Sequence, residues 1–390
     1  MSEENTEYRS LRPSEMKIDL DAVVTNYHLI EKQVAPAAVM PILKANAYGH
    51  GLVPCAQALE AAGAKRFCLA YLEEAVLLRR AGIKIPLLVL GGVAEEQIEA
   101  FIKYDVEVTA SSIFKLNKIE ERAAALGKKA HVHLKIDTGM ERLGVHYYSA
   151  QPFLEETLKC KYCDVVGIFS HFATVEEEDI SFAKLQLERF LECLDFFKQH
   201  NLPTPLRHIA NSAAILRMPE SYLDGVRPGL ILYGVPPAPH IKIMAGSKRS
   251  MTLRSAVSYF KVVQAGRGIS YDLTYVTPHQ TRVVTVPIGY GDGYPRSLSN
   301  KGSVLIRGRR YPIVGKICMD QMMVDIGSDG EAYNGDEVIL IGEQGDECIT
   351  LEEVASLAGT DPRDILCATN QRVPRYYSYK GENFIDGVLP

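Results

Sequence analysis

The first two-thirds of the chain, roughly, alternates short apolar runs with amphipathic segments. The apolar runs are five to seven residues long, which is typical of strands buried on both faces. Between them apolar residues recur at helical spacing, most clearly over 181–200. One more helix is expected over 20–33, before the first strand. The expected strands are 38–44, 66–71, 86–91, 106–110, 131–137, 165–171, 206–211 and 229–234.

Eight such strands with helices between them predict an α/β fold, a closed (β/α)8 TIM-like barrel. An open, doubly wound sheet is the alternative, but the strand count favours the barrel. After about residue 245 the pattern changes to β-branched runs separated by Gly, Asp and Asn, as in 281–288, 302–306, 321–326 and 337–341.

We therefore expect a C-terminal, mainly-β domain after the barrel. The predicted boundaries are a disordered tail over 1–11, a barrel over 12–245 and the β domain over 246–390. Pro236, Pro237 and Pro239 form a plausible linker.

Composition narrows the class of protein without identifying it. Apolar residues make up 47% of the 390 residues, enough for a large core, and no apolar run is long enough to cross a bilayer. A net charge of −5 gives no general attraction to nucleic acid or to anionic membranes. The polar N-terminus lacks the features of a signal peptide. We expect a cytoplasmic protein.

The eight cysteines show no framework spacing, which suits a reducing compartment. Cys160 and Cys163 form a CxxC motif, but no second pair and no histidine cluster accompany them. Coincidence is therefore the favoured interpretation over zinc or redox chemistry, and no metal is expected.

Polar side chains concentrate where the predicted barrel strands end, which is where barrel enzymes place their active sites. They are Lys44 after the first strand, Lys135, Asp137 and Arg142 around the fifth, Ser170 and His171 at the sixth, and Asn211 and Ser212 at the seventh. Arg227 precedes the predicted eighth strand, which Gly229 opens. Lys44 alone would be an ordinary strand-end lysine, but together these residues indicate a pocket.

A lysine in a desolvated barrel mouth suits covalent binding of a carbonyl cofactor, of which pyridoxal phosphate is the common one. Glycine-containing turns near Ser212 and Gly229 offer backbone N–H groups to a phosphate.

Nine sequence motifs resemble those of one known family of pyridoxal-phosphate enzymes. The sequence ILKANAYGHG at 42–51 resembles the cofactor-lysine signature of alanine racemases. Further matches follow in the order of that family: KIDTGMERLG (135–144), SHFAT (170–174), NSAA (211–214), VRPG (226–229), GISYDLTY (268–275), IGYGDGYPR (288–296), GKICMDQ (315–321) and RVPR (372–375). The resemblance covers roughly residues 12–380 and implies a homodimer with shared active sites.

The resemblance also implies a role for each matching residue. Lys44 would bind pyridoxal phosphate and act as one catalytic base, and Tyr271 of the partner subunit would be the other. Arg142 and the backbone amide of the partner's Met319 would hold the carboxylate of alanine. The remaining implied contacts are Arg227 at the pyridine nitrogen, His171 linking it toward Tyr271, and Tyr48, Ser212, Gly229 and Leu230 around the phosphate. Lys135 stands where many members carry a carbamylated lysine, and Tyr290 and Asp320 would line the substrate entrance.

The chemistry of racemisation supports residues of the types that the resemblance implies. Racemisation removes the α-proton on one face and returns one on the other, so a base on each face performs it directly. A free tyrosine has a pKa of about 10, so Tyr271 would need nearby positive charge or concerted transfer. An arginine donates a hydrogen bond but hardly gives up a proton, which would leave the ring nitrogen unprotonated.

Three positions depart from the pattern of the family. Asp272 stands where glycine usually follows the tyrosine, which could stiffen or tilt the turn. Glu15 replaces a commonly aromatic residue, and we expect no catalytic effect. Gln371 occupies the place of a phosphate-contacting tyrosine, so the shape of the pocket and its preferred side chain could differ.

Several functions stay open at this point. The nearest alternative is a racemase that prefers serine or accepts many amino acids. A decarboxylase of the same two-domain plan would release CO2 from its substrate. A non-catalytic carrier of pyridoxal phosphate would have no use for Tyr271, and a purely structural barrel leaves the polar strand ends unexplained. D-Alanine for peptidoglycan is the role implied by the resemblance, with alanine breakdown as the other possibility.

Overall fold

The computed structural model describes residues 12–385 and divides them into two compact units. One unit contains residues 22–47 and 52–248, and the other contains 48–51 and 249 onward together with the N-terminal segment up to Asp21. The predicted disordered tail over 1–11 lies outside the described residues. No helix within 12–385 combines the length and apolarity needed to span a membrane.

The first unit is a closed parallel barrel. Neighbouring strands pair in parallel around the ring, and single bridges, Ile42 to Cys68 and Leu88 to Glu107, complete it. The strands in ring order are β2 (Ala38–Val39), β3 (Phe67–Leu69), β4 (Leu87–Val89), β5 (Val108–Ala110), β6 (Ala130–Asp137), β8 (Cys163–Phe169), β9 (Leu206–His208) and β10 (Gly225–Val226). The predicted fold class is confirmed.

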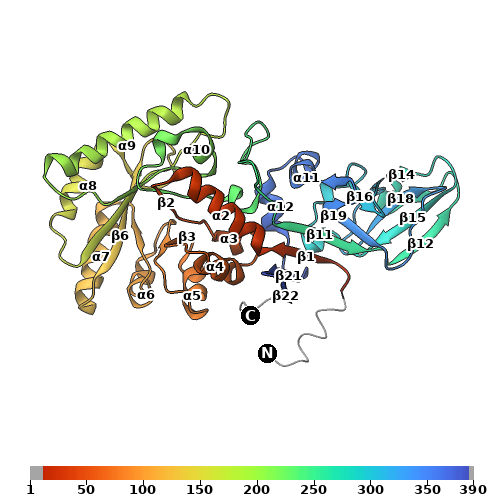
Figure 1. Ribbon diagram of the computed structural model, residues 1–390, viewed down its shortest axis with the longest axis horizontal. Helices are drawn as coiled ribbons and strands as arrows, with labels where there is room; N and C mark the ends of the chain where they lie inside the picture. The colour runs from red at the N-terminus through yellow and green to blue at the C-terminus, as the bar shows by residue number, and fades with distance from the viewer. Residues whose placement is uncertain (1–11, 386–390) are drawn as a thin grey trace. The chain divides into compact units, whose positions relative to one another are not determined.

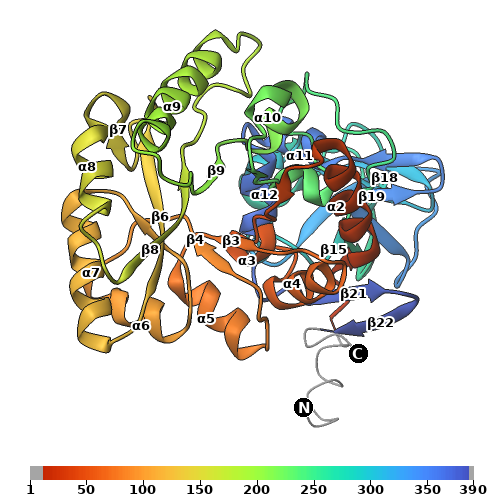
Figure 2. The same ribbon diagram turned by 60° about the vertical axis from the view of Figure 1, so that its left-hand side comes forward.

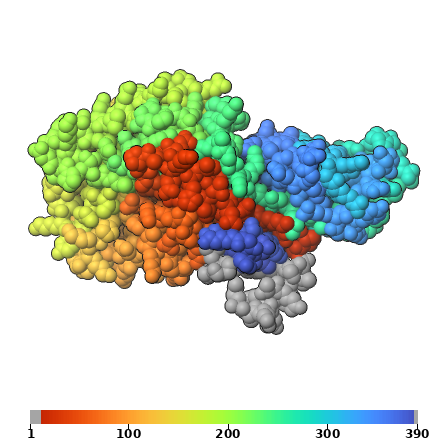
Figure 3. All heavy atoms as spheres, viewed as in Figure 1, coloured from red at the N-terminus to blue at the C-terminus, as the bar shows by residue number. Residues whose placement is uncertain are grey.

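Helices surround these strands, as Figures 1 and 2 show. In the space-filling view the segments of this unit that are visible run in colour from red to green (Figure 3). The helices are α2 (Leu20–Val34), α4 (Leu52–Ala61), α5 (Leu72–Arg80), α6 (Ile98–Lys103), α7 (Ile113–Leu126), α8 (Ala150–Thr157), α9 (Ser181–Gln199) and α10 (Ser212–Arg217). The helices predicted over 20–33 and 181–200 are therefore confirmed.

One predicted strand is wrong. Residues 230–233 form a short 3-10 helix, η4 (Leu230–Tyr233), whose four residues are all buried. The eighth barrel strand is β10, which ends just before Arg227. A short, fully buried apolar run carries no periodicity that separates strand from helix, so the pattern could not decide. Arg227 consequently follows a strand end, as the other polar residues of the barrel do, and Gly229 lies in the loop after it.

The second unit is built from β-sheets. Its largest sheet has the order β17-β16-β19-β11-β1-β21-β22, with β20 paired to β19, and a smaller sheet has the order β12-β15-β18. The strands are β1 (Glu15–Asp19), β11 (Met251–Ala256), β12 (Tyr259–Val263), β13 (Gly268–Ile269), β14 (Tyr275–Val276), β15 (Thr281–Val286), β16 (Ser303–Ile306), β17 (Arg309–Pro312), β18 (Met322–Gly327), β19 (Glu337–Gln344), β20 (Glu347–Ile349), β21 (Arg375–Tyr379) and β22 (Glu382–Ile385). Two helices, α11 (Leu351–Ala358) and α12 (Pro362–Ala368), complete the unit.

The N-terminal boundary differs from the prediction. Strand β1 pairs with β11 in antiparallel and with β21 in parallel orientation, so residues 12–21 belong to the β unit and not to the barrel. A single short strand at the start of the chain says nothing about which distant strands it will join. Glu15, one of the departures from the family pattern, forms an ion pair with Arg254 on the neighbouring strand.

Candidate active site

Lys44 lies directly after the first barrel strand in an uncommon backbone turn. Ala45, Asn46 and Ala47 have φ values of 54°, 56° and 53°, which places three consecutive non-glycine residues in the left-handed region. Each such residue costs roughly 1–2 kcal/mol, so neighbouring contacts must hold the turn. The Ala45 N–H donates to Glu74 at 2.7 Å, and the Asn46 side chain accepts from the Leu52 N–H at 2.7 Å. These contacts fix the half-buried Lys44 at the end of the strand.

Arg227 is buried and donates to four groups of the barrel. Its guanidinium reaches the carbonyls of Ser170 and Ile209 at 2.7 and 3.1 Å. It also contacts the Nδ1 atoms of His208 and His171, the latter at 3.2 Å. Burial lowers the pKa of Arg227 to about 10, so the group stays protonated near neutral pH. Arg227 is therefore a fixed donor that keeps its proton.

The donor role of Arg227 sets the tautomers of a chain of histidines. Because a guanidinium only donates, the Nδ1 of His208 accepts and its Nε2 carries the proton. That Nε2–H donates to His133 Nδ1 at 3.0 Å, so His133 in turn donates through Nε2 to Glu107 at 3.1 Å. The Glu107 carboxylate also accepts from Arg66 at 2.8 and 2.9 Å. A continuous buried relay thus supports the guanidinium of Arg227.

The relay depends on a glycine in the neighbouring strand. Gly167 of β8 lies opposite His133 of β6 in the strand register. A Cβ at Gly167 would lie 2.1 Å from His133 Nδ1, so any larger residue would displace the imidazole. The residues predicted from the sequence did not include His133, His208, Glu107 and Arg66. The available signal was a histidine at an inward position of a strand whose neighbour carries a glycine.

Electrostatics keep His171 neutral. Burial, followed by the positive charges of Arg227, Lys135, Arg142 and Lys44, holds the pKa of His171 well below its ordinary value. Since Nδ1 accepts from Arg227, the single proton of the ring lies on Nε2. His171 therefore presents an N–H donor on its other edge.

Lys135 is buried on β6 among cations. Burial and the positive charge of Arg227 lower the pKa of Lys135 to about 7, although Asp137 opposes the shift. Its ammonium group lies 5.3 Å from the centre of the Phe169 ring and donates to the Ile136 carbonyl at 2.8 Å. A substantial fraction of Lys135 is consequently a neutral amine, and hence a nucleophile, near pH 7.

The loop after β6 carries Arg142. Asp137 accepts N–H groups of Gly139, Met140 and Arg142 at 2.8, 2.9 and 3.2 Å. Burial raises the pKa of Asp137, but these backbone donors outweigh it and hold the pKa below its ordinary value. The charged carboxylate thus anchors the loop that positions Arg142, whose side chain is exposed.

Ser212, Gly229 and Leu230 meet where β9 and β10 end. Ser212 begins α10, and its Oγ accepts from the Gly229 N–H at 2.8 Å. The Ser212 hydroxyl keeps its own proton to donate. Asn211 caps the same helix by accepting from the Ala214 N–H at 3.0 Å. Tyr48, the fourth residue predicted here, is half-buried, has a φ of 52° and belongs to the segment that groups with the β unit.

The β unit carries the other predicted residues, and their side chains are largely exposed. Tyr271 is 67% exposed, Met319 52% and Tyr290 41%. Tyr271 lies in a tight turn in which Ser270, Asp272 and Leu273 all have positive φ. Asp272, at the usual glycine position of the family, adopts a φ of 57° and forms an ion pair with Lys316. The departure therefore keeps the glycine-like backbone and adds a charged contact.

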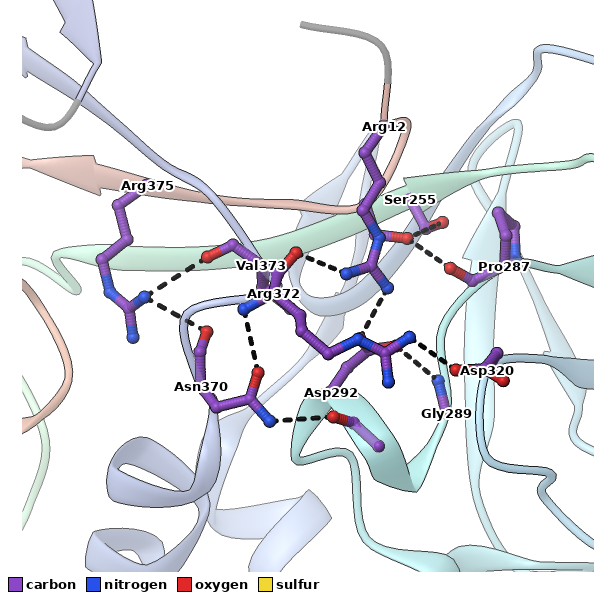
Figure 4. Close-up of polar contacts among 12 residues, drawn as sticks. Arg12, Ser255, Pro287, Gly289, Asp292, Asp320, Asn370, Arg372, Val373 and Arg375 are labelled. Atoms are coloured by element: carbon purple, nitrogen blue, oxygen red, sulfur yellow. Dashed lines mark hydrogen bonds and ion pairs between the residues drawn. The ribbon is translucent and has the colours of Figure 1, made fainter. Parts of the chain in front are cut away.

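Asp320 belongs to a network of arginines and carboxylates (Figure 4). Arg372 contacts Asp320 and also the buried Asp292, the latter at 3.3 Å. Arg12 reaches Asp292 at 2.6 Å. Gln371, next to Arg372, is exposed. The loop 318–321 that presents Met319 and Asp320 is thus tied to the C-terminal RVPR motif.

The donors of the barrel fit pyridoxal phosphate. Lys44, Arg142 and Arg227 place three cationic groups, with the partly neutral Lys135 beside them, against the single carboxylate of Asp137 among the predicted residues of this unit. Such an excess suits a phosphate dianion and a substrate carboxylate. A closed parallel barrel with a lysine after its first strand, continued by a β unit, defines the barrel-type class of pyridoxal-phosphate enzymes.

Comparisons with known proteins identify the family within this class. Family models described as the N-terminal and the C-terminal domain of alanine racemase match residues 18–237 and 250–377. The alanine racemase of Carboxydothermus hydrogenoformans is 44% identical over 368 residues, covering 94% of this chain and 100% of that protein. The chain belongs to the alanine racemase family, whose members are pyridoxal-phosphate-dependent isomerases, and the resemblance seen in the motifs is confirmed.

Solved structures of alanine racemases have the same fold as this chain. The Bacillus anthracis alanine racemase with bound L-Ala-P has a TM-score of 0.89 at 34% identity, covering 97% of each chain. The Bartonella henselae alanine racemase with covalently bound pyridoxal phosphate has a TM-score of 0.85 at 32% identity, covering 94% of this chain and 99% of that one.

Proposed function

We propose that this chain binds pyridoxal phosphate and interconverts L- and D-alanine by a two-base mechanism, with Lys44 on one face and Tyr271 of the partner subunit on the other. The observation that carries the proposal is the cationic barrel mouth, in which Lys44 follows the first strand and Arg227 is fixed as a permanent donor. When bound, the cofactor supplies an electron sink that makes the α-proton of an amino acid labile.

The residues of the barrel divide the work of binding. Lys44 attaches the cofactor and moves a proton at the α-carbon. Ser212 donates its hydroxyl proton to the phosphate, and Tyr48, Gly229 and Leu230 surround it. Arg227 faces the ring nitrogen. Because Arg227 keeps its proton, the nitrogen stays unprotonated, which weakens the electron sink and favours return of the proton to the α-carbon.

The substrate carboxylate is held by Arg142 and by the amide of the partner's Met319. We propose that Lys135 is carbamylated and that the resulting carboxylate orients Arg142. A neutral, nucleophilic amine with a pKa of about 7 supports this modification, since the neutral amine forms a bond from its nitrogen to the carbon of CO2 and releases one proton to solvent.

His171 assists the second base. Its Nε2–H, fixed by the contact of Nδ1 with Arg227, can donate toward Tyr271 of the partner subunit and stabilise a phenolate. Tyr290 and Asp320 line the entrance in this proposal. The large exposed fraction of Tyr271 supports a role outside its own unit, and hence a homodimer with shared sites.

We further propose that the enzyme acts in the cytoplasm and supplies D-alanine for peptidoglycan. The test of the activity is a chiral panel of amino acids assayed with purified, cofactor-loaded protein. Alanine should be the best substrate and serine the second, because Tyr290, which is exposed, suggests a narrow entrance; Tyr294 in the same motif is buried and does not contribute to this argument. Faster turnover of lysine or arginine would contradict the proposed pocket, and release of CO2 would indicate a decarboxylase.

A further inference from the structure

The fold brings Glu120 to the CxxC motif. Glu120 lies in α7, Cys160 follows α8, and Cys163 is the first residue of β8. One carboxylate oxygen and the two Sγ atoms all lie within 4.8 Å of one another. Figure 2 shows α7 and α8 next to each other on the outer side of β6 and β8. The motif lacked a further ligand in the sequence, and the fold supplies one from a neighbouring helix.

The carboxylate of Glu120 holds the loop between the two cysteines. It accepts the N–H groups of Lys161, Tyr162 and Cys163 at 2.7, 2.9 and 2.6 Å. Three consecutive backbone donors on one carboxylate fix the turn, and with it the positions of both sulfur atoms. The three ligand groups are therefore arranged before any ion arrives, which reduces the entropy cost of binding.

The spacing suits a tetrahedral ion. Thiolates bound to zinc at about 2.3 Å in tetrahedral geometry lie roughly 3.8 Å apart, so ligand atoms within 4.8 Å need only a small contraction. Cys160 and Glu120 are half-exposed, whereas Cys163 is buried, so an ion can enter from solvent past the first two.

The two thiols are not equivalent. Cys160 is half-exposed and its Sγ donates to the Glu156 carbonyl at 3.7 Å, whereas the buried Cys163 donates to the Leu116 carbonyl at 3.9 Å. An arriving cation therefore meets Cys160 first, and its positive charge favours ionisation of both thiols.

We propose that Cys160, Cys163 and Glu120 form a binding site for a thiophilic divalent cation such as Zn²⁺, with water as the fourth ligand. Two thiolates select zinc or cadmium over magnesium or calcium, and the carboxylate completes three protein ligands. The two thiol protons are released to solvent when the ion binds. The site joins α7 to the start of β8, whereas His171 follows the other end of that strand, so the ion would brace the barrel without entering the chemistry.

The test uses the full chain, reduced, treated with a chelator and freed of it. Titration with Cd²⁺ should produce the thiolate-to-cadmium charge-transfer absorption with one ion bound per chain. Zn²⁺ should bind at the same stoichiometry in competition with a chromogenic chelator. Racemase activity should be the same for the Cys160→Ser variant and the parent, which separates this result from the outcome for the proposed function.

Matched variants locate the site. Cys160→Ser should abolish the charge-transfer band and weaken Zn²⁺ binding by more than about 10-fold, because loss of even an outer partner of a metal ligand costs about that much. Glu120→Gln should keep the band, since both thiolates remain, but weaken Zn²⁺ binding by about 10-fold. Cys348→Ser, in β20 of the other unit, is the control and should bind as the parent does.

Two results would overturn the proposal. One is the absence of saturable binding to the reduced chain, including the case in which the two cysteines only form a disulfide. The other is binding that Cys160→Ser leaves unchanged. Cys160 is half-exposed, so its replacement by serine gives a folded variant even if Cys163→Ser does not.

Discussion

The turns that carry Lys44 and Tyr271 have similar backbones but opposite surroundings. Both contain several non-glycine residues with positive φ, Ala45–Tyr48 in one and Ser270, Asp272 and Leu273 in the other. Ala47, in the Lys44 turn, is completely buried. In the Tyr271 turn, Tyr271 itself is 67% exposed and Leu273 61%. A strained turn persists only when its surroundings hold it. The Lys44 turn has a buried centre at Ala47, whereas residues 271–274 are all exposed and the Tyr271 turn is held through contacts of Ser270 and Asp272 with Lys316.

This difference suggests how the catalytic groups are divided. The Lys44 turn is fixed by its own unit, through Glu74, Asn46 and the burial of Ala47. The Tyr271 turn exposes large apolar side chains of the kind that protein interfaces cover. We infer that a second copy of the chain covers it, which agrees with the proposed shared site. The predictions below test this contrast, beginning with the largest effect.

Lys44→Ala should lower racemase activity by more than about 10³-fold, because it removes both the attachment of the cofactor and one of the two bases. Borohydride reduction of the parent protein followed by peptide mapping should find the cofactor on Lys44. Lys103→Ala, at an exposed lysine of the barrel, is the control and should keep full activity. Recovery of the adduct on another lysine would refute the assignment.

Complementation tests whether Tyr271 acts in the partner subunit. Lys44→Ala and Tyr271→Phe should each be nearly inactive. When they are co-expressed or refolded together in equal amounts, half of the dimers are mixed. In a mixed dimer one shared site carries both substitutions and the other carries neither. Activity should recover to about a quarter of the parent value, as half of the dimers have half of their sites intact.

The two models of the site give different results in that experiment. If Tyr271 served its own subunit, every site of a mixed dimer would carry one substitution and no activity would return. Mixed dimers must therefore be demonstrated, for example by two different affinity tags. A mixture that contains them and stays inactive argues against sharing.

Arg227→Glu should increase transamination relative to racemisation. A carboxylate can share a proton with the ring nitrogen, which strengthens the electron sink and lengthens the life of the deprotonated substrate. The measurement is pyridoxamine phosphate formed per racemisation event. Arg227→Gln is the matched control, because it removes the cation without adding an ionisable group, and it should raise the ratio less. An unchanged ratio in a folded, cofactor-loaded Arg227→Glu protein would exclude this role.

A pH series tests Lys135. Its pKa of about 7 means that the neutral amine predominates above pH 7 and the ammonium below it. Carbamylation consumes the neutral amine and releases a proton, so at constant dissolved CO2 it should decrease as the pH is lowered, and Arg142 should be less well oriented. Between about pH 8 and pH 6 the neutral fraction alone falls about tenfold, so the KM for alanine should rise over this range. Lys135→Met should have a raised KM at every pH, and a pH response equal to that of the parent would contradict the model.

Sequence patterns predicted seven of the eight barrel strands and four strands of the β unit, β15, β16, β18 and β19, because periodicity and burial are local properties. They placed Lys44 and His171 after strand ends correctly. Residues 230–233 were predicted as a strand but form η4, because a short apolar run has no periodicity that separates strand from helix. The segment that forms β1 was assigned to the barrel, because its partner strands are distant in sequence. The relay from Arg227 to Glu107 and the approach of Glu120 to the CxxC motif depend on contacts between segments that are distant in sequence, which only the fold reveals.

The smallest effect concerns the strain in the Lys44 turn. Ala45 is exposed and has a φ of 54°, so glycine there relieves roughly 1–2 kcal/mol of strain without loss of a buried methyl group. Greater freedom of the unfolded chain offsets about 0.4–1 kcal/mol of that gain. Ala45→Gly should therefore raise the Tm slightly, by about 1–3 °C.

Ala124→Gly, at an exposed position inside α7, is the matched control. The same substitution should lower the Tm there, because glycine costs about 1 kcal/mol in a regular helix. Equal decreases for both variants would show that Ala45 is not strained, and that the Lys44 turn owes its shape to local preference and not to the packing around it.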